Sequence, residues 1–240
     1  MNLSNNKNKY MMGIDEAGRG SLIGPMIVAG VVIEEDAFEK LRASGVRDSK
    51  QLSPERREKL IEVIRRVASW IGIVEVTPRE IDEFNLNTIT LNAMCWLLKN
   101  AISDYGSSLE VVYIDNVSGI KEYMVLRKLS LLEKDAEKPL RKPKIVIEPK
   151  ADRKYLPVAA ASIVAKVIRD KILFSYKEKY GLEGSGYPSD TKTTSWLFKN
   201  IKEVPPDIVR WKWKTVRNLG LGKESGIGDL TKYLVKRERG

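Results

Sequence analysis

Four carboxylate residues and one glycine-rich basic loop are the parts of this chain that could carry chemistry. Asp15 and Glu16 end one apolar run, Asp115 ends another, and Asp152 follows a third. Adjacent acids are costly to bury unless something neutralises them. Carboxylate oxygens suit Mg²⁺ or Mn²⁺. Two such ions about 3.5–4 Å apart can promote in-line attack of water on a phosphodiester.

Two absences narrow the chemistry further. The chain contains no histidine, and its single cysteine is Cys95. Ser-His and Cys-His catalysis, histidine-ligated zinc and a disulfide framework are therefore excluded. An enzyme built on this sequence has to use carboxylates, Lys, Tyr, Ser or a bound metal.

Each acid also has a plainer interpretation. Asp15 and Glu16 could begin a solvated turn, and Asp115 before Asn116 could be a turn residue. Asp152 could be an acid that stabilises the start of a helix. For any one residue the plainer interpretation is preferable. The recurrence of acids at strand ends in a basic protein favours a shared metal site.

The composition indicates an anionic partner. The chain has 240 residues and a formal net charge of +10, which point to one large domain, or a domain with an added piece, that binds nucleic acid. General solubility is the alternative explanation of the charge. Residues 1–9 are polar and no run approaches the length of a membrane span, so we expect a cytoplasmic protein.

The acids need a sheet to bring them together, and the sequence predicts one. Apolar, β-branched runs predict five strands, of which the first ends at Asp15-Glu16; the others are Gly24–Ile33, Trp70–Val76, Leu109–Asp115 and Lys144–Glu148. Apolar periodicity and capping residues predict helices over Glu35–Ala43, from Ser53 to about Ala68, from Thr77, and over Asn87–Ala101, Gly119–Leu132, Tyr155–Tyr180 and Thr191–Asn200.

This order predicts an α/β core followed by helices. We expect a core over 10–180, a helical C-terminal subdomain over 181–220, and a linker and tail over 221–240. Neighbouring strand ends converge at one edge of an α/β sheet, so the acids could share one site. The second strand is expected to run antiparallel to the first. Gly18, Gly20 and Gly24 do not fit a dinucleotide-binding loop well, because such a loop opens a helix and this one opens a strand.

Several longer motifs follow one another along the chain. They are Gly13–Gly20 (GIDEAGRG), Arg47–Lys50 (RDSK), Tyr113–Asp115 (YID), Lys150–Asp152 (KAD), Ala159–Asp170 (AAASIVAKVIRD) and Gly184–Asp190 (GSGYPSD). Together they resemble ribonuclease HII, the type 2 ribonuclease H family, in its archaeal-like form. The resemblance covers about Gly13 to Leu219.

The resemblance implies a ribonuclease H-like fold, with a mixed five-stranded sheet flanked by helices and a helical C-terminal subdomain. It implies a monomeric, metal-dependent endonuclease that cleaves the RNA strand of RNA/DNA hybrids. It also implies incision 5′ of single ribonucleotides in duplex DNA, leaving 5′-phosphate and 3′-hydroxyl ends. The alternatives are an inactive module that binds RNA/DNA hybrids, and another nuclease of the same fold, such as a junction resolvase.

The resemblance also implies roles for particular residues. The catalytic metal ligands for Mg²⁺ or Mn²⁺ are Asp15, Glu16, Asp115 and Asp152. The groups expected to bind substrate are the sugar-reading loop Gly18, Arg19 and Gly20, the phosphate contact Lys50, and Tyr187 at the RNA–DNA junction. Ser21 and Thr191 stand where the family commonly has proline, and we expect both changes to loosen local loops.

The C-terminal part contributes two further expectations. Its basic residues suit phosphate binding, whereas Trp211 and Trp213 are expected to pack; the basic residues are Arg210, Lys212, Lys214 and Arg217. The tail over 227–234 resembles a peptide that binds the sliding clamp (PCNA), although Ile227 replaces the expected glutamine. A short amphipathic terminal helix is the alternative.

Overall fold

The computed structural model describes residues 8–46, 52–116, 119–132 and 142–218. They form two compact units, each built from separated segments of the chain. The sheet unit takes its described residues from 1–17, 28–74 and 87–167, and the C-terminal unit takes its own from 18–27, 75–86 and 168–240. The linear division into core, subdomain and tail stays a prediction.

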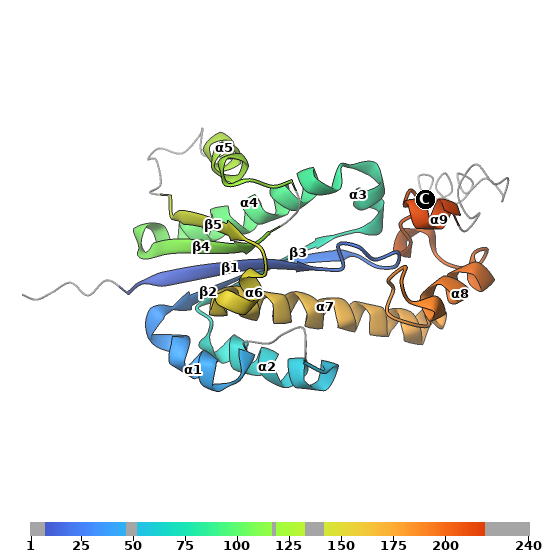
Figure 1. Ribbon diagram of the computed structural model, residues 1–240, viewed down its shortest axis with the longest axis horizontal. Helices are drawn as coiled ribbons and strands as arrows, with labels where there is room; N and C mark the ends of the chain where they lie inside the picture. Colours follow the sequence, from blue (N-terminus) through green and yellow to red (C-terminus); the bar gives the residue numbers. More distant parts are fainter. Residues whose placement is uncertain (1–7, 47–51, 117–118, 133–141, 219–240) are drawn as a thin grey trace, which may run out of the picture. The chain divides into compact units, whose positions relative to one another are not determined.

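The sheet unit is built on five strands in the order β3-β2-β1-β4-β5 (Figure 1). The strands are β1 (Tyr10–Ala17), β2 (Met26–Glu34), β3 (Trp70–Val76), β4 (Leu109–Asp115) and β5 (Lys144–Glu148). β4 runs parallel to both β1 and β5. The predicted strands and the mixed sheet are confirmed.

β2 runs antiparallel to both of its neighbours, β1 and β3. The Glu35 N–H, just after β2, donates to the Lys9 carbonyl, just before β1. Likewise the Ser69 N–H, before β3, donates to the Val32 carbonyl near the end of β2. The antiparallel arrangement predicted for the second strand is therefore present. β2 is buried from Met26 to Ile33, as expected for a strand covered on both faces.

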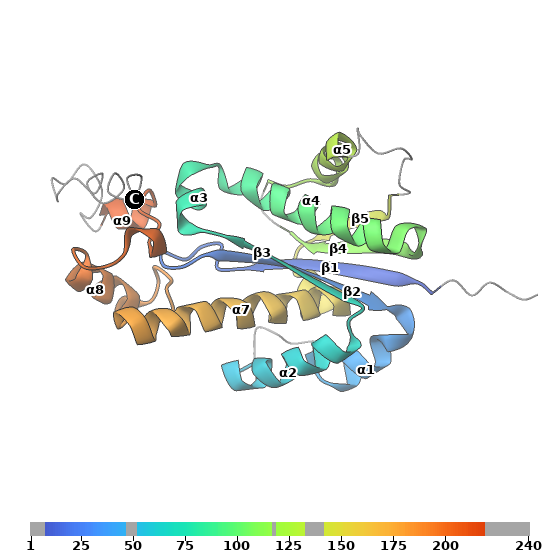
Figure 2. The same ribbon diagram turned by 180° about the vertical axis from the view of Figure 1, so that it is seen from behind.

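Helices cover both faces of this sheet. Figures 1 and 2 show α4 (Leu86–Tyr105) and α5 (Glu122–Leu132) over one face, and α1 (Phe38–Ala43), α2 (Pro54–Val67) and the first half of α7 (Leu156–Tyr180) over the other. α2 begins as its sequence predicts, because the Ser53 hydroxyl accepts from the Arg56 N–H. The predicted helix over Tyr155–Tyr180 is preceded by a separate short helix, α6 (Ala151–Lys154).

α7 lies very close to β1, as its small residues predicted. A side chain added to Gly13 would overlap the Pro157 carbonyl group and the Val158 nitrogen. Ala159, Ala160 and Ala161 have no exposed surface. The backbone of α7 thus packs almost directly on the backbone of β1, which determines the distance between the helix and the strand.

The C-terminal unit has its own apolar cluster. It contains α3 (Pro78–Glu83), the end of α7, α8 (Thr191–Asn200), a 3₁₀ turn at Pro206–Ile208 and α9 (Lys214–Asn218). Leu22, Ile23, Leu197 and Val209 are among the buried residues of the cluster. Trp211 and Trp213 pack against it, which confirms their predicted packing role.

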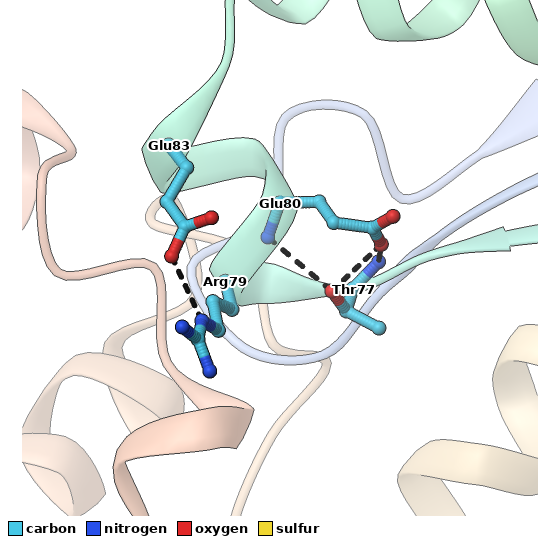
Figure 3. Close-up of polar contacts among 4 residues, drawn as sticks. All are labelled: Thr77, Arg79, Glu80 and Glu83. Atoms are coloured by element: carbon cyan, nitrogen blue, oxygen red, sulfur yellow. Dashed lines mark hydrogen bonds and ion pairs between the residues drawn. The ribbon is translucent and has the colours of Figure 1, made fainter. Parts of the chain in front are cut away.

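α3 begins with the capping box that its sequence predicts. The Thr77 hydroxyl accepts from the Glu80 N–H, and the Glu80 carboxylate accepts from the Thr77 N–H (Figure 3). The helix can therefore present Asp82 in a defined direction. Asp82 accepts from the N–H groups of Trp211 and Lys212, which anchors the segment that follows Val209. No helix among the described residues has the length and apolar character to cross a membrane.

Candidate active site

Asp15 and Asp115 meet because β1 and β4 are parallel and in register. Ile14 pairs with Ile114, so the next residue of each strand is one of these acids. The carboxyl ends of parallel strands lie at the same edge of a sheet. Repulsion by Asp115 contributes to the raised pKa of Asp15, as expected for two nearby carboxylates.

The Asp15 side chain faces α7. Gly13 lies two residues earlier on β1, about 6.7 Å back along a strand, and it contacts Pro157. Ser162 lies five residues after Pro157, about 7.5 Å along a helix. Because these two distances along β1 and α7 are similar, Ser162 lies opposite Asp15. The Ser162 hydroxyl hydrogen-bonds the Asp15 carboxylate. Lys166, one turn later, donates to the Ser162 oxygen at 3.0 Å.

Burial dominates the electrostatics of Asp15. Asp15 is 5% exposed, and its pKa is raised from 3.8 to about 6, mainly by desolvation. The Ser162 hydrogen bond, the Glu16 N–H at 2.8 Å and the charge of Lys166 oppose the increase. When ionised, the Asp15 carboxylate therefore holds a negative charge that its protein surroundings compensate only in part.

Asp115 and Asp152 are connected through the start of α6. The Ala151 N–H donates to the Asp115 carboxylate at 2.8 Å, and Asp152 is the next residue, 2% exposed. Lys150 precedes both with φ 58°, a left-handed conformation that costs a non-glycine residue energy. This bend turns the chain from β5 into α6 and brings Asp152 to the same part of the sheet edge.

Glu16 leaves β1 on the opposite side from Asp15, because successive strand residues point to opposite faces. It is half-buried. Among the described residues no three His, Cys, Asp or Glu side chains form a ready-made metal cage. Proteins usually hold Mg²⁺ through one or two carboxylates together with substrate phosphates. Buried Asp15, whose pKa is raised by desolvation, and half-buried Asp115 together have the charge that such an ion neutralises.

The strand edge continues into residues that were not predicted as functional. Glu148 pairs with Asp115 in the β4–β5 register. It forms an ion pair with Lys154 and accepts from the Tyr155 hydroxyl at 3.0 Å. The Tyr155 ring stacks on Tyr113 with centroids 3.8 Å apart. Glu148 is therefore engaged with cationic and phenolic partners, which distinguishes it from the neighbouring Asp115.

The predicted sugar-reading loop belongs to the C-terminal unit and forms a β-turn. The Ser21 N–H donates to the Gly18 carbonyl at 3.3 Å, and the Ser21 hydroxyl donates to the same oxygen at 2.9 Å. Ser21 is fully buried. The expectation that serine would loosen this loop is wrong, because its two donors hold the turn closed. Gly18 has φ +82°, which favours glycine.

Gly18 and Gly20 differ in the space that is available for a side chain. A side chain at Gly18 would overlap the Arg169 guanidinium and lie 2.7 Å from the Pro25 carbonyl oxygen. A Cβ at Gly20 would meet no described atom within 4 Å. Gly20 is exposed. Packing therefore explains the glycine at position 18 and leaves the one at position 20 unexplained.

Tyr187 lies in the same unit and is supported by a buried arginine. The Arg169 guanidinium carbon lies 4.7 Å from the centroid of the Tyr187 ring, and its Nη2 donates to the Ser185 carbonyl at 3.2 Å. Arg169 is 4% exposed. Its position among apolar residues in a predicted helix could have indicated from the sequence that Arg169 is buried.

The basic C-terminal stretch divides into two groups. Lys212, Lys214 and Arg217 are exposed, so they remain available to phosphates. Arg210 is fully buried, and the predicted phosphate contact is wrong for this residue. Lys50 and the clamp-like tail over 227–234 lie outside the described residues, and their roles stay predictions.

The family is established by comparison with known proteins. The family model for ribonuclease HII matches residues 12–216. Ribonuclease HII of Sulfurisphaera tokodaii is 42% identical over 211 residues, which cover 87% of this chain and 95% of that protein.

Solved structures agree with this assignment. Ribonuclease H2 from Pyrococcus horikoshii has a TM-score of 0.74 at 36% identity, covering 88% of this chain and 96% of that one. A chain in the PCNA:RNase HII complex from Archaeoglobus fulgidus has a TM-score of 0.72 at 38% identity, covering 87% and 96%. The predicted ribonuclease H-like fold is confirmed. The chain belongs to the ribonuclease HII family and is a ribonuclease H enzyme.

Proposed function

We propose that this ribonuclease H hydrolyses the RNA strand of RNA/DNA hybrids and incises 5′ of single ribonucleotides in duplex DNA, with Asp15, Glu16, Asp115 and Asp152 as ligands for Mg²⁺ or Mn²⁺. The observation that carries the proposal is the buried Asp15 carboxylate beside Asp115, at the carboxyl edge of two parallel strands. Two divalent ions, when bound, supply the charge that activates water and stabilises the leaving 3′ oxygen.

The chain's own residues prepare that edge. Ser162 holds the Asp15 carboxylate, and Lys166 in turn orients Ser162. The Ala151 N–H fixes one oxygen of Asp115. Ligands held by neighbouring hydrogen bonds lose little freedom when a metal or substrate arrives. The resulting chemistry needs no histidine, which this chain lacks.

Recognition is assigned to the C-terminal unit. A 2′-hydroxyl is the group that distinguishes a ribonucleotide from a deoxyribonucleotide. Backbone groups of Gly18, Arg19 and Gly20 are proposed to contact it, with Tyr187 beside the RNA–DNA junction and Lys50 on a phosphate. The space at Gly20, where a Cβ would meet no described atom within 4 Å, supports close approach of a sugar.

Product mapping tests the proposal directly. A DNA duplex containing one ribonucleotide is incubated with the protein in Mg²⁺, in Mn²⁺ and in EDTA, and the ends are identified. We expect incision on the 5′ side of the ribonucleotide, leaving 5′-phosphate and 3′-hydroxyl ends, with no cleavage in EDTA. Asp15→Asn should abolish cleavage in both Mg²⁺ and Mn²⁺. Full activity of that variant would contradict the role of Asp15.

A sliding clamp is proposed as a protein partner. The similar Archaeoglobus fulgidus chain is from a PCNA:RNase HII complex, and the tail over 227–234 resembles a clamp-binding peptide. The test is a titration of the full chain, and of a chain ending at Asn218, with an archaeal PCNA. Binding that survives removal of the tail would contradict this location for the contact.

A further inference from the structure

Arg210 is the buried charge that the proposed chemistry leaves unused. Its side chain has no exposed surface. Burial, followed by repulsion from Arg169, lowers its pKa to about 9, so enclosing this cation costs free energy. A fold that keeps such a residue has to compensate it through many hydrogen bonds.

The compensation comes from backbone carbonyls of the loop region. Arg210 Nη2 donates to the Gly18 carbonyl at 2.6 Å, and Nη1 donates to the Arg19 carbonyl at 2.7 Å. Nε and Nη2 both donate to the Gly24 carbonyl, at 3.2 and 3.0 Å. The Trp213 ring centroid lies 5.3 Å from the guanidinium carbon. One planar fork therefore holds three carbonyls, which a lysine ammonium does not reproduce.

Holding these carbonyls determines where the neighbouring N–H groups point. In a trans peptide the C=O and the following N–H point in opposite directions. The Gly18 and Arg19 carbonyls are turned inward to Arg210, so the N–H groups of Arg19 and Gly20 are directed away from the guanidinium. Gly20 is exposed. The turn thus presents adjacent backbone donors on its outer side, an arrangement suited to an oxygen acceptor.

The second buried arginine connects this turn to Tyr187. Arg169 lies against the Cα of Gly18, where it leaves no room for a side chain. The same guanidinium supports the Tyr187 ring and the Ser185 carbonyl. Arg169 therefore contacts the Tyr187 ring, and Arg210 donates hydrogen bonds to the turn itself. Both arginines belong to the C-terminal unit.

We infer that Arg210 is a positioning residue for ribonucleotide recognition, which holds the Gly18–Gly20 turn so that its backbone donors face the 2′-hydroxyl of the substrate. The inference rests on the proposed function of this loop. Arg210 does not touch substrate, and it acts through the Gly18 and Arg19 carbonyls, two of the three that it binds. Asp82 supports it from α3 by anchoring the N–H groups of the next two residues.

The test separates sugar reading from duplex binding. For wild type and Arg210→Lys, kcat/KM is measured with Mg²⁺ on a duplex bearing one ribonucleotide. The inhibition constant of the all-DNA duplex of the same sequence is measured in parallel. Misplacing two donors should lower kcat/KM by about tenfold or more, as expected for hydrogen bonds lost in the reacting complex. The inhibition constant should change by less than about twofold, because phosphate contacts remain.

Controls make each outcome decisive. Arg79→Lys is the matched control, because Arg79 is exposed and pairs with Glu83 on α3 (Figure 3), and its kcat/KM should equal that of wild type. If wild type cleaves long hybrids but never the embedded ribonucleotide, the proposed function fails. If wild type incises it and folded Arg210→Lys does so equally well, the positioning role is overturned.

A milder variant provides the test if Arg210→Lys does not fold. Should circular dichroism show that Arg210→Lys is unfolded, Ser21→Ala removes one donor from the same Gly18 carbonyl. Its kcat/KM on the embedded ribonucleotide should fall about threefold with an unchanged inhibition constant for all-DNA duplex, as one weakened hydrogen bond implies. An unchanged kcat/KM for Ser21→Ala would then overturn the inference.

Discussion

Replacing Asp15 by asparagine should stabilise the metal-free protein while abolishing its activity. Asparagine has nearly the same shape, and its carbonyl can still accept from Ser162 and the Glu16 N–H. The charge that Asp115 repels is removed. Because the native pKa of Asp15 is raised, its contribution to stability is fully present below about pH 4 and is lost as the pH rises through about 6.

The magnitude follows from the two pKa values. An increase from 3.8 to about 6 corresponds to about 3 kcal/mol of stability lost once the carboxylate is ionised in both states. About 2 kcal/mol of that develops between roughly pH 4.5 and pH 8. Relative to wild type, Asp15→Asn should therefore gain about 2 kcal/mol of unfolding free energy across this interval.

The assay is urea unfolding in EDTA at both pH values, with Asp104→Asn, an exposed acid of the sheet unit, as the matched control. Adding Mn²⁺ at the higher pH should stabilise wild type and narrow its gap to Asp15→Asn, because an ion that binds only the native state favours it. If the stability difference between Asp15→Asn and wild type is the same at both pH values, the electrostatic account of this site is wrong.

Three further substitutions test individual parts of the structure. Gly20→Ala should leave the melting temperature unchanged, because its Cβ meets no described atom within 4 Å, yet lower incision at an embedded ribonucleotide; unchanged kinetics would argue against sugar contact there. Gly13→Ala should destabilise the protein by about 3 kcal/mol or more in urea unfolding, because the methyl group would overlap the backbone of α7. Lys150→Gly should raise stability by about 1 kcal/mol by relieving a left-handed φ of 58°; a loss in calorimetry would show that the lysine side chain contributes more than its backbone costs.

The elements that position the acids were accessible from local sequence. Leu109–Asp115 and Lys144–Glu148 are short β-branched runs, and their predicted bounds match β4 and β5. Ser53 and Thr77 mark helix starts through hydrogen bonds within one turn. These features depend on neighbours a few residues apart, so the sequence displays them directly.

Other features depend on contacts far apart in the chain. Arg210 stands among basic residues and was predicted to bind phosphate, whereas its hydrogen-bond partners lie 186 to 192 positions earlier. The effect of Ser21 depends on whether its hydroxyl faces the Gly18 carbonyl, which composition does not reveal. The partnership of Ser162 and Lys166 follows from helical spacing, but its role at Asp15 required the register of α7 on β1.

The dependence of the Gly18–Ser21 turn on Arg210 has a consequence for synthesis on the ribosome. All four carboxylates are translated by residue 152, and the loop itself is among the first segments made. The side chain that holds the loop carbonyls arrives nearly two hundred residues later. A nascent chain that stops before Arg210 therefore lacks the side chain that supports this turn. The turn that is proposed to select the substrate therefore gains this support only after all four carboxylate residues have been synthesised.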